Sequence, residues 1–146
     1  MHTPKRILVI ENNIGEGAFL QSQLKKNQLQ KHLNFINDGG VALAYLTEPR
    51  SKCEELAAVF LDLHLPTVDG LRILETIRSD DRLHNLSVIV ITSSNSPEEL
   101  ERCRELGVSN YVDKPLTLSS FAKAFADSFH ARRVSAGRVA TGFANA

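Results

Sequence analysis

The sequence has no hydrophobic stretch long enough to cross a membrane and no recognisable export signal. No apolar run approaches the roughly 20 residues that a membrane-spanning helix needs. The N-terminal segment MHTPKRILVIE has basic residues and then a very short apolar run, without the apolar core and the small-residue cleavage site of a signal peptide. We therefore expect a cytoplasmic protein that does not bind membranes.

The sequence also lacks an excess of either charge, and it has few cysteines. Its 17 basic and 17 acidic residues give a formal net charge of zero, so a general nucleic-acid-binding surface is not expected. The two cysteines, Cys53 and Cys103, stand alone, without CxxC or histidine-rich spacing. Reduced thiols are therefore favoured over a disulfide or a metal site.

The residues that are present are typical of one globular domain. The chain has 146 residues, of which 42% are hydrophobic and 23% charged, enough for a single sizeable core. Short apolar runs predict strands over residues 6–11, 32–36, 57–63, 86–92 and 110–113. Three of these runs are β-branched and apolar throughout, which is typical of parallel strands covered on both faces.

Helical patterns separate the strands. They predict helices over residues 14–27, 40–48, 70–79, 97–106 and 118–131. The fourth helix has the clearest start, because Ser96 and Glu99 match a capping box and Pro97 falls at the first helical position. Gly107 fits the position just after its end. Helices between successive strands require crossover connections, so the pattern predicts an α/β domain with a parallel sheet.

Apolar residues mark each of these helices. In the first three they are Ile14, Phe19, Leu20, Leu24, Val41, Ala44, Tyr45, Leu71, Ile73, Leu74 and Ile77. The last helix places Leu118, Phe121, Ala122, Phe125 and Phe129 on one face.

Polar side chains collect where the expected strands end. Glu11 and Asn12 follow the first strand, Asp62 the third and Thr92 the fourth, and Lys114 follows the fifth. Singly, an acid there is usually turn chemistry and a threonine reflects β-propensity. Their joint occurrence favours a ligand site instead, because open α/β sheets bind ligands outside the carboxyl ends of their strands.

Such a cluster is suited to phosphoryl transfer onto a carboxylate. Asp62 is the candidate nucleophile, since a carboxylate forms an acyl phosphate. Mg²⁺, which prefers oxygen ligands, would neutralise the phosphoryl charge beside Asp62 and Glu11. Lys114 would pair with one phosphoryl oxygen, and Thr92 would donate a hydrogen bond to another.

At these residues the sequence resembles the receiver domain of two-component response regulators, of the chemotaxis-regulator type, over about residues 5–130. The motifs are Glu11-Asn12, Asp62 with LHLPTVDG, Thr92-Ser93 and Lys114-Pro115. Within that family, the segments LDLHLP and ITSSNSPEEL look most like the single-domain regulators paired with bacterial phytochromes and related hybrid-type histidine kinases.

The resemblance implies a flavodoxin-like, doubly wound five-stranded parallel sheet of order 2-1-3-4-5, with five helices. It implies that Asp62 takes a phosphoryl group from a sensor histidine kinase and that the protein is a phosphoacceptor rather than an enzyme. The metal ligands would be Glu11, Asn12, Asp62 and the backbone carbonyl of His64. The peptide bond before Pro115 would be cis.

The resemblance also assigns residues that report or tune phosphorylation. Tyr111 matches the switch aromatic that turns inward when Thr92 moves; the alternative is an edge-strand aromatic that covers the core, and both can hold. His64 and Ser94 match positions that tune autodephosphorylation, against the alternative of simple loop residues.

One position departs from the family pattern. The family usually has two acids after the first strand, and the second is a direct metal ligand, whereas here the second residue is Asn12. An amide oxygen still binds Mg²⁺, but without the charge. We therefore hypothesise weaker Mg²⁺ binding.

The expected domain spans residues 1–131 and is followed by a tail, 132–146, with no output domain. Signalling is then expected through protein contacts, and the family's usual face is formed by the fourth helix, fifth strand and fifth helix. On this chain that face includes Glu98, Glu101, Arg102, Arg104, Glu105 and Tyr111. We hypothesise a homodimer through this face, through the tail as an exchanged arm with Val134, Val139 and Phe143, or through both.

Three functions compete at this point. The first is a phosphorylated single-domain response regulator. The second is a pseudo-receiver, an interaction module that no longer uses phosphate, and Asn12 is its best support. The third is a haloacid-dehalogenase-type phosphatase, which is discounted because its nucleophile motif would lie on the first strand, where this chain has Glu-Asn-Asn.

Overall fold

The computed structural model describes residues 6–26, 33–48, 55–93 and 96–135, with side chains described up to residue 127. Strands and helices alternate along the chain, as predicted. The strands are β1 (Arg6–Ile10), β2 (Leu33–Ile36), β3 (Leu56–Asp62), β4 (Ser87–Thr92) and β5 (Asn110–Asp113). The helices are α1 (Ile14–Lys26), α2 (Gly39–Thr47), α3 (Gly70–Ser79), α4 (Pro97–Glu105) and α5 (Leu118–Ser135).

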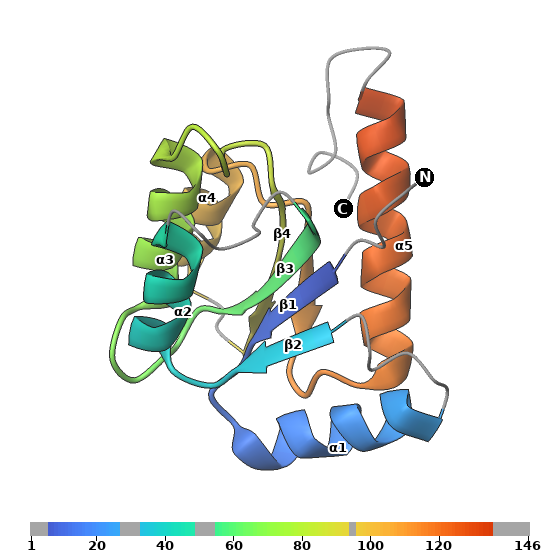
Figure 1. Ribbon diagram of the computed structural model, residues 1–146. Coiled ribbons are helices and arrows are strands. Elements are labelled where there is room, and N and C mark those ends of the chain that lie inside the picture. Colours follow the sequence, from blue (N-terminus) through green and yellow to red (C-terminus); the bar gives the residue numbers. More distant parts are fainter. Residues whose placement is uncertain (1–5, 27–32, 49–54, 94–95, 136–146) are drawn as a thin grey trace.

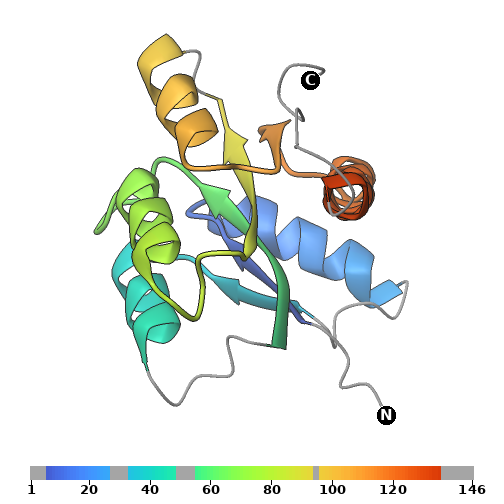
Figure 2. The ribbon, with the colours of Figure 1, turned by 90° about the horizontal axis from the view of Figure 1, so that it is seen from above.

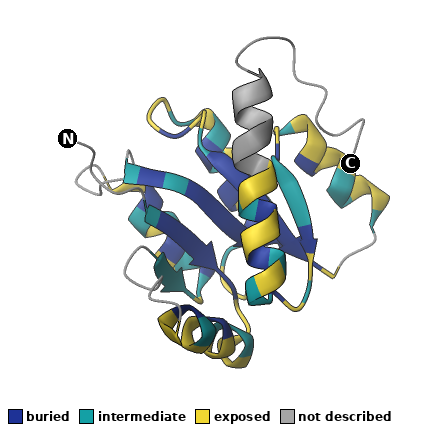
Figure 3. Cartoon of the chain, turned by 90° about the vertical axis from the view of Figure 1, so that its right-hand side faces the viewer, coloured by how far each residue is buried: buried dark blue, intermediate teal, exposed yellow. Residues whose placement is uncertain are grey.

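The strands form one parallel five-stranded sheet of order β2-β1-β3-β4-β5, which confirms the predicted doubly wound fold. Helices α2, α3 and α4 cover one face of the sheet, and α1 and α5 cover the other (Figures 1 and 2). Because side chains alternate along a strand, Leu8 and Ile10 point into one core while Ile7 and Val9 point into the other. Both faces are therefore apolar, and the described strands are largely buried in Figure 3.

The strand register brings the predicted polar residues to one edge of the sheet. Ile10, the last residue of β1, pairs with Leu61 of β3, so Glu11 follows beside Asp62. Asp62 in turn pairs with Ile91, which directly precedes Thr92. The sheet thus sets the spacing of the candidate site before any loop contributes to it.

Local hydrogen bonds at the helix ends explain where several helices begin and end. Asn13 caps α1 by accepting from the N–H of Glu16 at 2.9 Å, and Ser96 caps α4 by accepting from the N–H of Glu99 at 3.4 Å. Gly107 follows α4 with a φ of 71°, and the next N–H, that of Val108, donates back to the carbonyl of Cys103. A residue with a Cβ is strained at that φ, so this helix end requires glycine.

Several of the apolar residues that mark the helices are exposed. Ile14, Phe19 and Val41 are 68%, 59% and 57% exposed. Ala44 and Ala122 are exposed as well. The residues that α2 and α5 bury instead include Ala42, Leu46 and Ala124. Phe129 and Val134 lie outside the described side chains.

Helix α5 is also longer than predicted, since it continues to Ser135 rather than ending at residue 131. The added residues, RRVS, contain no glycine or proline to stop a helix, and the first glycine beyond them is Gly137. Among the described helices, none combines the length and the apolar character that crossing a bilayer requires.

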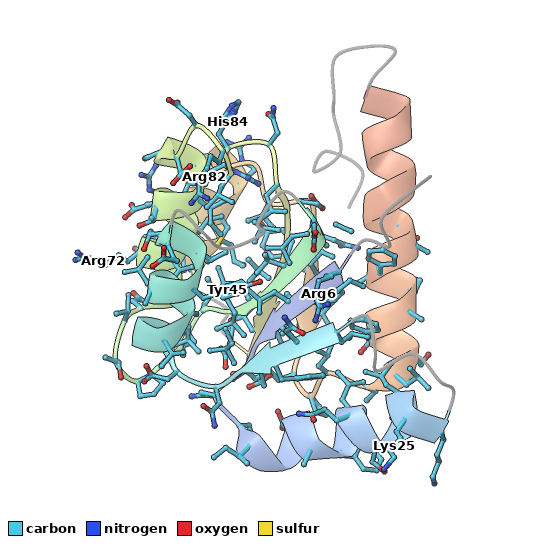
Figure 4. All side chains as sticks on the ribbon, viewed as in Figure 1. Arg6, Lys25, Tyr45, Arg72, Arg82 and His84 are labelled. Atoms are coloured by element: carbon cyan, nitrogen blue, oxygen red, sulfur yellow. The ribbon has the colours of Figure 1, made fainter. Side chains whose placement is uncertain are left out.

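Two arginines join the helices at the end of the molecule away from Asp62. Arg78, in the last turn of α3, donates to backbone carbonyls of Leu106 and Gly107 after α4 and of His84 and Leu86 before β4. Arg82 donates to the carbonyl of Leu46 in α2 at 3.1 Å. Figure 4 shows Arg82 and His84 at this distant end, so His84 takes no part in the candidate site.

Candidate functional site

Asp62 lies at the carboxyl end of β3, in the middle of the sheet, and is completely buried. Its Oδ1 accepts the backbone N–H of His64 at 2.9 Å. Its Oδ2 lies 2.7 Å from the ammonium nitrogen of Lys114 and 3.4 Å from the backbone nitrogen of Asn12. A buried carboxylate is stabilised only by such partners, so these contacts hold Asp62 in one orientation.

Lys114 reaches this carboxylate from the segment after β5, where the Lys114–Pro115 peptide bond is cis. Its ammonium nitrogen also lies 3.6 Å from Oε1 of Glu11. Burial by itself lowers the pKa of Lys114, but the hydrogen bond to Asp62 and the charges of Asp62 and Glu11 outweigh burial, and the pKa is raised. Lys114 is therefore the positive centre of the site.

Glu11 is the second buried carboxyl group, with 5% of its surface exposed. Burial raises the pKa of Glu11 to about 7, and neighbouring Asp62 adds to this rise, while the N–H of Asn13 and the charge of Lys114 act against it. Oε1 accepts the N–H of Asn13 at 3.1 Å. Oε2 is buried and has no hydrogen-bond partner among the described residues. Such an atom is expected to bind a cation or water, because an unsatisfied buried oxygen is costly.

Asn12 is placed beside the loop that follows Asp62. Its side-chain nitrogen donates to the backbone carbonyl of His64 at 2.9 Å. That carbonyl is the one the family resemblance assigns to the metal. The amide of Asn12 and the expected metal thus share one acceptor.

The donor set fits a hard divalent cation. Glu11 and Asp62 supply carboxylate oxygens, and His64 and Asn12 supply a carbonyl and an amide oxygen, all of the kind that Mg²⁺ or Mn²⁺ binds. The unpartnered Oε2 of Glu11 marks the same place. Within the described ranges, however, no group of three or more His, Cys, Asp or Glu side chains is placed to hold a metal. The charge of the site therefore rests on two carboxylates.

The loop between β3 and α3 is packed tightly against its neighbours. A Cβ on Gly70 would lie 2.4 Å from the carbonyl oxygen of Asp62, and a Cβ on Gly39 would lie 2.3 Å from that of Val68. Thr67 donates to Asp38, the N-cap of α2, at 2.5 Å. This hydrogen bond lowers the pKa of Asp38, and the cap bond to Val41 N–H lowers it further. Close packing at two glycines and one hydrogen bond thus fix the loop that follows the phosphoacceptor candidate.

The residues assigned to switching and tuning are only partly in contact with this cluster. Thr92 is buried at the end of β4. Tyr111 lies in β5, packs against the core, and donates its hydroxyl to the carbonyl of Leu100 in α4 at 3.3 Å. Burial raises the pKa of Tyr111 to about 12. Ser94 lies outside the described residues.

Sequence reasoning missed the contact between His64 and α4. Nε2 of His64 lies 3.6 Å from Oε1 of Glu99, while the backbone of His64 contacts Asp62 and Asn12. Glu99 is separated from His64 along the chain by β4, so no local pattern signals the pair. The capping-box pattern that identified Glu99 explains only its position in the first turn of α4.

Four of the charged residues expected on the signalling face, Glu101, Arg102, Arg104 and Glu105, are paired within the chain. Arg102 contacts Glu75 of α3 at 3.0 Å and Glu105 at 3.2 Å. Arg104 pairs with Glu101 one turn earlier in α4. All five side chains are exposed, so each pair contributes little to stability.

A pocket of about 280 Å³ opens beside Glu11, between the start of α1 and the start of α2. Its apolar lining includes Ile14, Phe35 and Val41. The exposed side chains of Ile14 and Val41 thus line the same pocket as the buried carboxyl group of Glu11.

The chain is similar to proteins of known family and structure. The family model described as response regulator receiver domain matches residues 7–126. The structure of the bacteriophytochrome response regulator AtBRR is 36% identical with a TM-score of 0.71, and the match covers 88% of this chain and 94% of that one.

Two further proteins show the same likeness. Response regulator Rcp1 of Synechocystis sp. is 29% identical over 127 residues, covering 82% of this chain and 83% of Rcp1. A crystal structure of the Mn²⁺-bound form of response regulator Rcp1 has 28% identity and a TM-score of 0.67, covering 84% and 91% of the two chains. The phosphorylated cyanobacterial phytochrome response regulator RcpA has 25% identity and a TM-score of 0.68, covering 91% and 92%.

Proposed function

Since the chain belongs to the response regulator receiver domain family, we propose that it accepts a phosphoryl group on Asp62 from a histidine kinase and signals through protein contacts. One observation carries the proposal: the buried carboxylate of Asp62 lies 2.7 Å from the ammonium group of Lys114, beside a second buried carboxyl group. This is the arrangement that aspartyl phosphorylation needs. The phosphorylated RcpA structure supports it by similarity.

The transfer breaks the P–N bond of a phosphohistidine and forms a P–O bond to a carboxylate oxygen of Asp62. Lys114 already contacts that carboxylate, so its ammonium group is in place to pair with a phosphoryl oxygen as charge develops. The N–H of His64 holds the other carboxylate oxygen and fixes the direction of attack. Thr92 supplies a hydroxyl at the neighbouring strand end.

We infer that Mg²⁺ is the cation of this site, held by Glu11, Asp62 and the carbonyl of His64, while Asn12 occupies the position where the family usually has an acidic ligand. When bound, it would neutralise the negative charge that the phosphoryl group brings to the two carboxylates. The Mn²⁺-bound form of Rcp1 supports a divalent cation here by similarity.

Incubation with a small phosphodonor and Mg²⁺, followed by intact-mass measurement, tests the proposal. We expect the mass of one added phosphoryl group in the wild type and none in Asp62→Asn. An absence of the added mass in the wild type, with the donor and with a kinase, would instead favour the pseudo-receiver.

We propose that the protein is cytoplasmic and that its partner is a sensor histidine kinase, with a bacteriophytochrome as the candidate because AtBRR is named for one. The exposed side chains of Ile14 and Val41, beside Glu11, offer an apolar surface for a protein that must reach Asp62. Comparing the rate of phosphoryl transfer from a bacteriophytochrome with the rate from an unrelated histidine kinase tests this assignment. Equal rates would remove the phytochrome assignment.

We also propose a homodimer. It would use the α4–β5–α5 face, the arm formed by residues 132–146, or both, with residues 1–131 as the receiver domain. Because Arg102 and Arg104 already form ion pairs within the chain, we expect apolar contacts and the arm to contribute more to the stability of the dimer than these arginines do. Deleting residues 132–146 is expected to shift the mass in solution towards the monomer, and an unchanged dimer would exclude the arm.

A further inference from the structure

Asn12 is the site residue that departs most from the family pattern, and its contact fixes how its amide is turned. The amide nitrogen lies 2.9 Å from the carbonyl oxygen of His64. A carbonyl oxygen has no hydrogen to donate, so only the NH₂ end of the amide can face it. The orientation therefore follows from chemistry.

An aspartate at this position would behave differently. A carboxylate oxygen and a carbonyl oxygen both carry negative charge, and at the same distance they would repel each other unless a cation lay between them. With asparagine, the contact is attractive without any cation. Asparagine and aspartate therefore differ here in more than charge, because the contact with the His64 carbonyl changes from attractive to repulsive.

The same loop is held by other groups of the protein as well. The N–H of His64 donates to Asp62, and the hydroxyl of Thr67 donates to Asp38. Together with the bond from the amide of Asn12, these bonds connect the loop to the end of β3, to the start of α2 and to the segment before α1. None of them requires a metal.

We propose that the amide of Asn12 holds the His64 carbonyl in place of a divalent cation, so that the loop after Asp62 is ordered without metal and metal binding must displace this hydrogen bond. Asn12 is then a positioning residue and a competitor of the cation. This inference rests on the proposed function only in that it concerns the same metal site.

The proposal distinguishes three roles that Asn12 can have in metal binding, and each predicts a different affinity for Asn12→Ala. If only the loss of charge matters, the wild type and Asn12→Ala bind the metal with equal affinity, since both residues are neutral. An amide that acts as a metal ligand makes Asn12→Ala bind more weakly. An amide that competes with the metal makes Asn12→Ala bind more tightly than the wild type.

Mn²⁺ affinity, followed by the electron paramagnetic resonance signal of the free ion, tests this order. We expect Asn12→Ala to bind Mn²⁺ about two- to tenfold more tightly than the wild type, the range set by one net hydrogen bond. Asn12→Asp should bind more tightly still. Asn85→Ala, an exposed asparagine away from the site, is the matched control and should not change the affinity. Equal or weaker binding by Asn12→Ala overturns the proposal.

Amide hydrogen exchange of residues 63–65 and 67 in metal-free protein gives a second readout. The wild type should protect these amides, and Asn12→Ala and Asn12→Asp should lose protection, which Mg²⁺ restores in Asn12→Asp. Unchanged protection in metal-free Asn12→Ala would refute the positioning role. Asn12 is exposed, so its variants should fold, and urea unfolding checks this.

Phosphoryl acceptance is measured separately by intact mass. A protein that shows the expected order of Mn²⁺ affinities but takes no phosphoryl group keeps this inference and loses the proposed function. A protein that is phosphorylated but shows the reverse order loses only the inference.

Discussion

Gly70, the first residue of α3, allows this helix to start directly against the strand that carries Asp62. Its N–H donates to the carbonyl of Leu63 at 3.0 Å. A Cβ added to it would lie 2.4 Å from the carbonyl oxygen of Asp62, 2.6 Å from Cα of Leu63 and 2.9 Å from the carbonyl oxygen of Leu63. All three are backbone atoms of the central strand or its first loop residue, so they cannot move aside without moving the phosphoacceptor.

Gly70→Ala is therefore expected to destabilise the fold. Overpacking of this kind costs about 1–3 kcal/mol, and contact with backbone on two residues places it in the upper part of that range. A loss of about 2–3 kcal/mol lowers the melting temperature of a domain this size by roughly 5–10 °C. Phosphoryl acceptance should fall as well, because the carbonyl of Asp62 shifts with its side chain.

Gly17→Ala is the matched control. Gly17 lies inside α1, and a Cβ there would meet no atom within 4 Å. Alanine should stabilise this helix by about 0.5–1 kcal/mol through its higher helix propensity. Urea unfolding followed by far-ultraviolet circular dichroism measures both variants. The reasoning is refuted if the free energy of unfolding of Gly70→Ala lies within about 0.5 kcal/mol of the wild-type value, which is the range of a neutral surface substitution.

Three further outcomes follow from buried polar groups. Lys114→Met should lower the free energy of unfolding at pH 7 by about 2–3 kcal/mol, since Asp62 loses its charged partner. In an Asp62→Asn background, urea titration should show a clearly smaller loss, and an equal loss would contradict the pairing. Arg78→Met should cost about 2–4 kcal/mol, because it leaves backbone carbonyls unpaired after α4 and before β4; hydrogen exchange should increase at the end of α4, and no increase there would contradict the role. Burial raises the pKa of the Cys103 thiol to about 11. In Cys53→Ser protein at pH 8, a disulfide reagent should therefore label it at least about 100-fold more slowly in the folded state than in the unfolded state, and equal rates would contradict its burial.

Much of the fold could be predicted because its strands have a strong signal. β3 is apolar from Leu56 to Leu61 and β4 from Val88 to Ile91, and burial on both faces is the physical reason. The ends of α4 were also predictable, since Pro97 and Gly107 have backbone requirements that do not depend on distant residues.

The helix faces were harder to predict. α2 has the sequence GGVALAYLT, which is apolar nearly all round, so its pattern does not favour one side. Packing on the sheet buries Ala42 and Leu46 and leaves Val41 in solvent. Which side of α2 is buried therefore depends on tertiary packing and not on the helix sequence alone.

The meeting of the candidate site residues at one edge of the sheet could be predicted, but their contacts could not. Parallel strands bring their carboxyl ends to one edge, and this places Glu11 beside Asp62. The bonds from Asn12 to His64 and from Thr67 to Asp38 join loops that are distant in sequence. They depend on side-chain orientation, for which the sequence has no periodic signal.

The two ends of α4 are held by different kinds of contact, and this difference determines how a change at Asp62 reaches the surface. At its carboxyl end, the guanidinium group of Arg78 donates to the carbonyls of Leu106 and Gly107, and the bond to Leu106 is partly buried. At its amino end, Glu99 lies 3.6 Å from the exposed ring of His64. The backbone of His64 in turn holds Asp62. A shift of the loop after Asp62 therefore reaches the first turn of α4 through one weak contact, while the last turn stays fixed by stronger ones. The expected response is a pivot of α4 about its carboxyl end rather than a displacement of the whole helix.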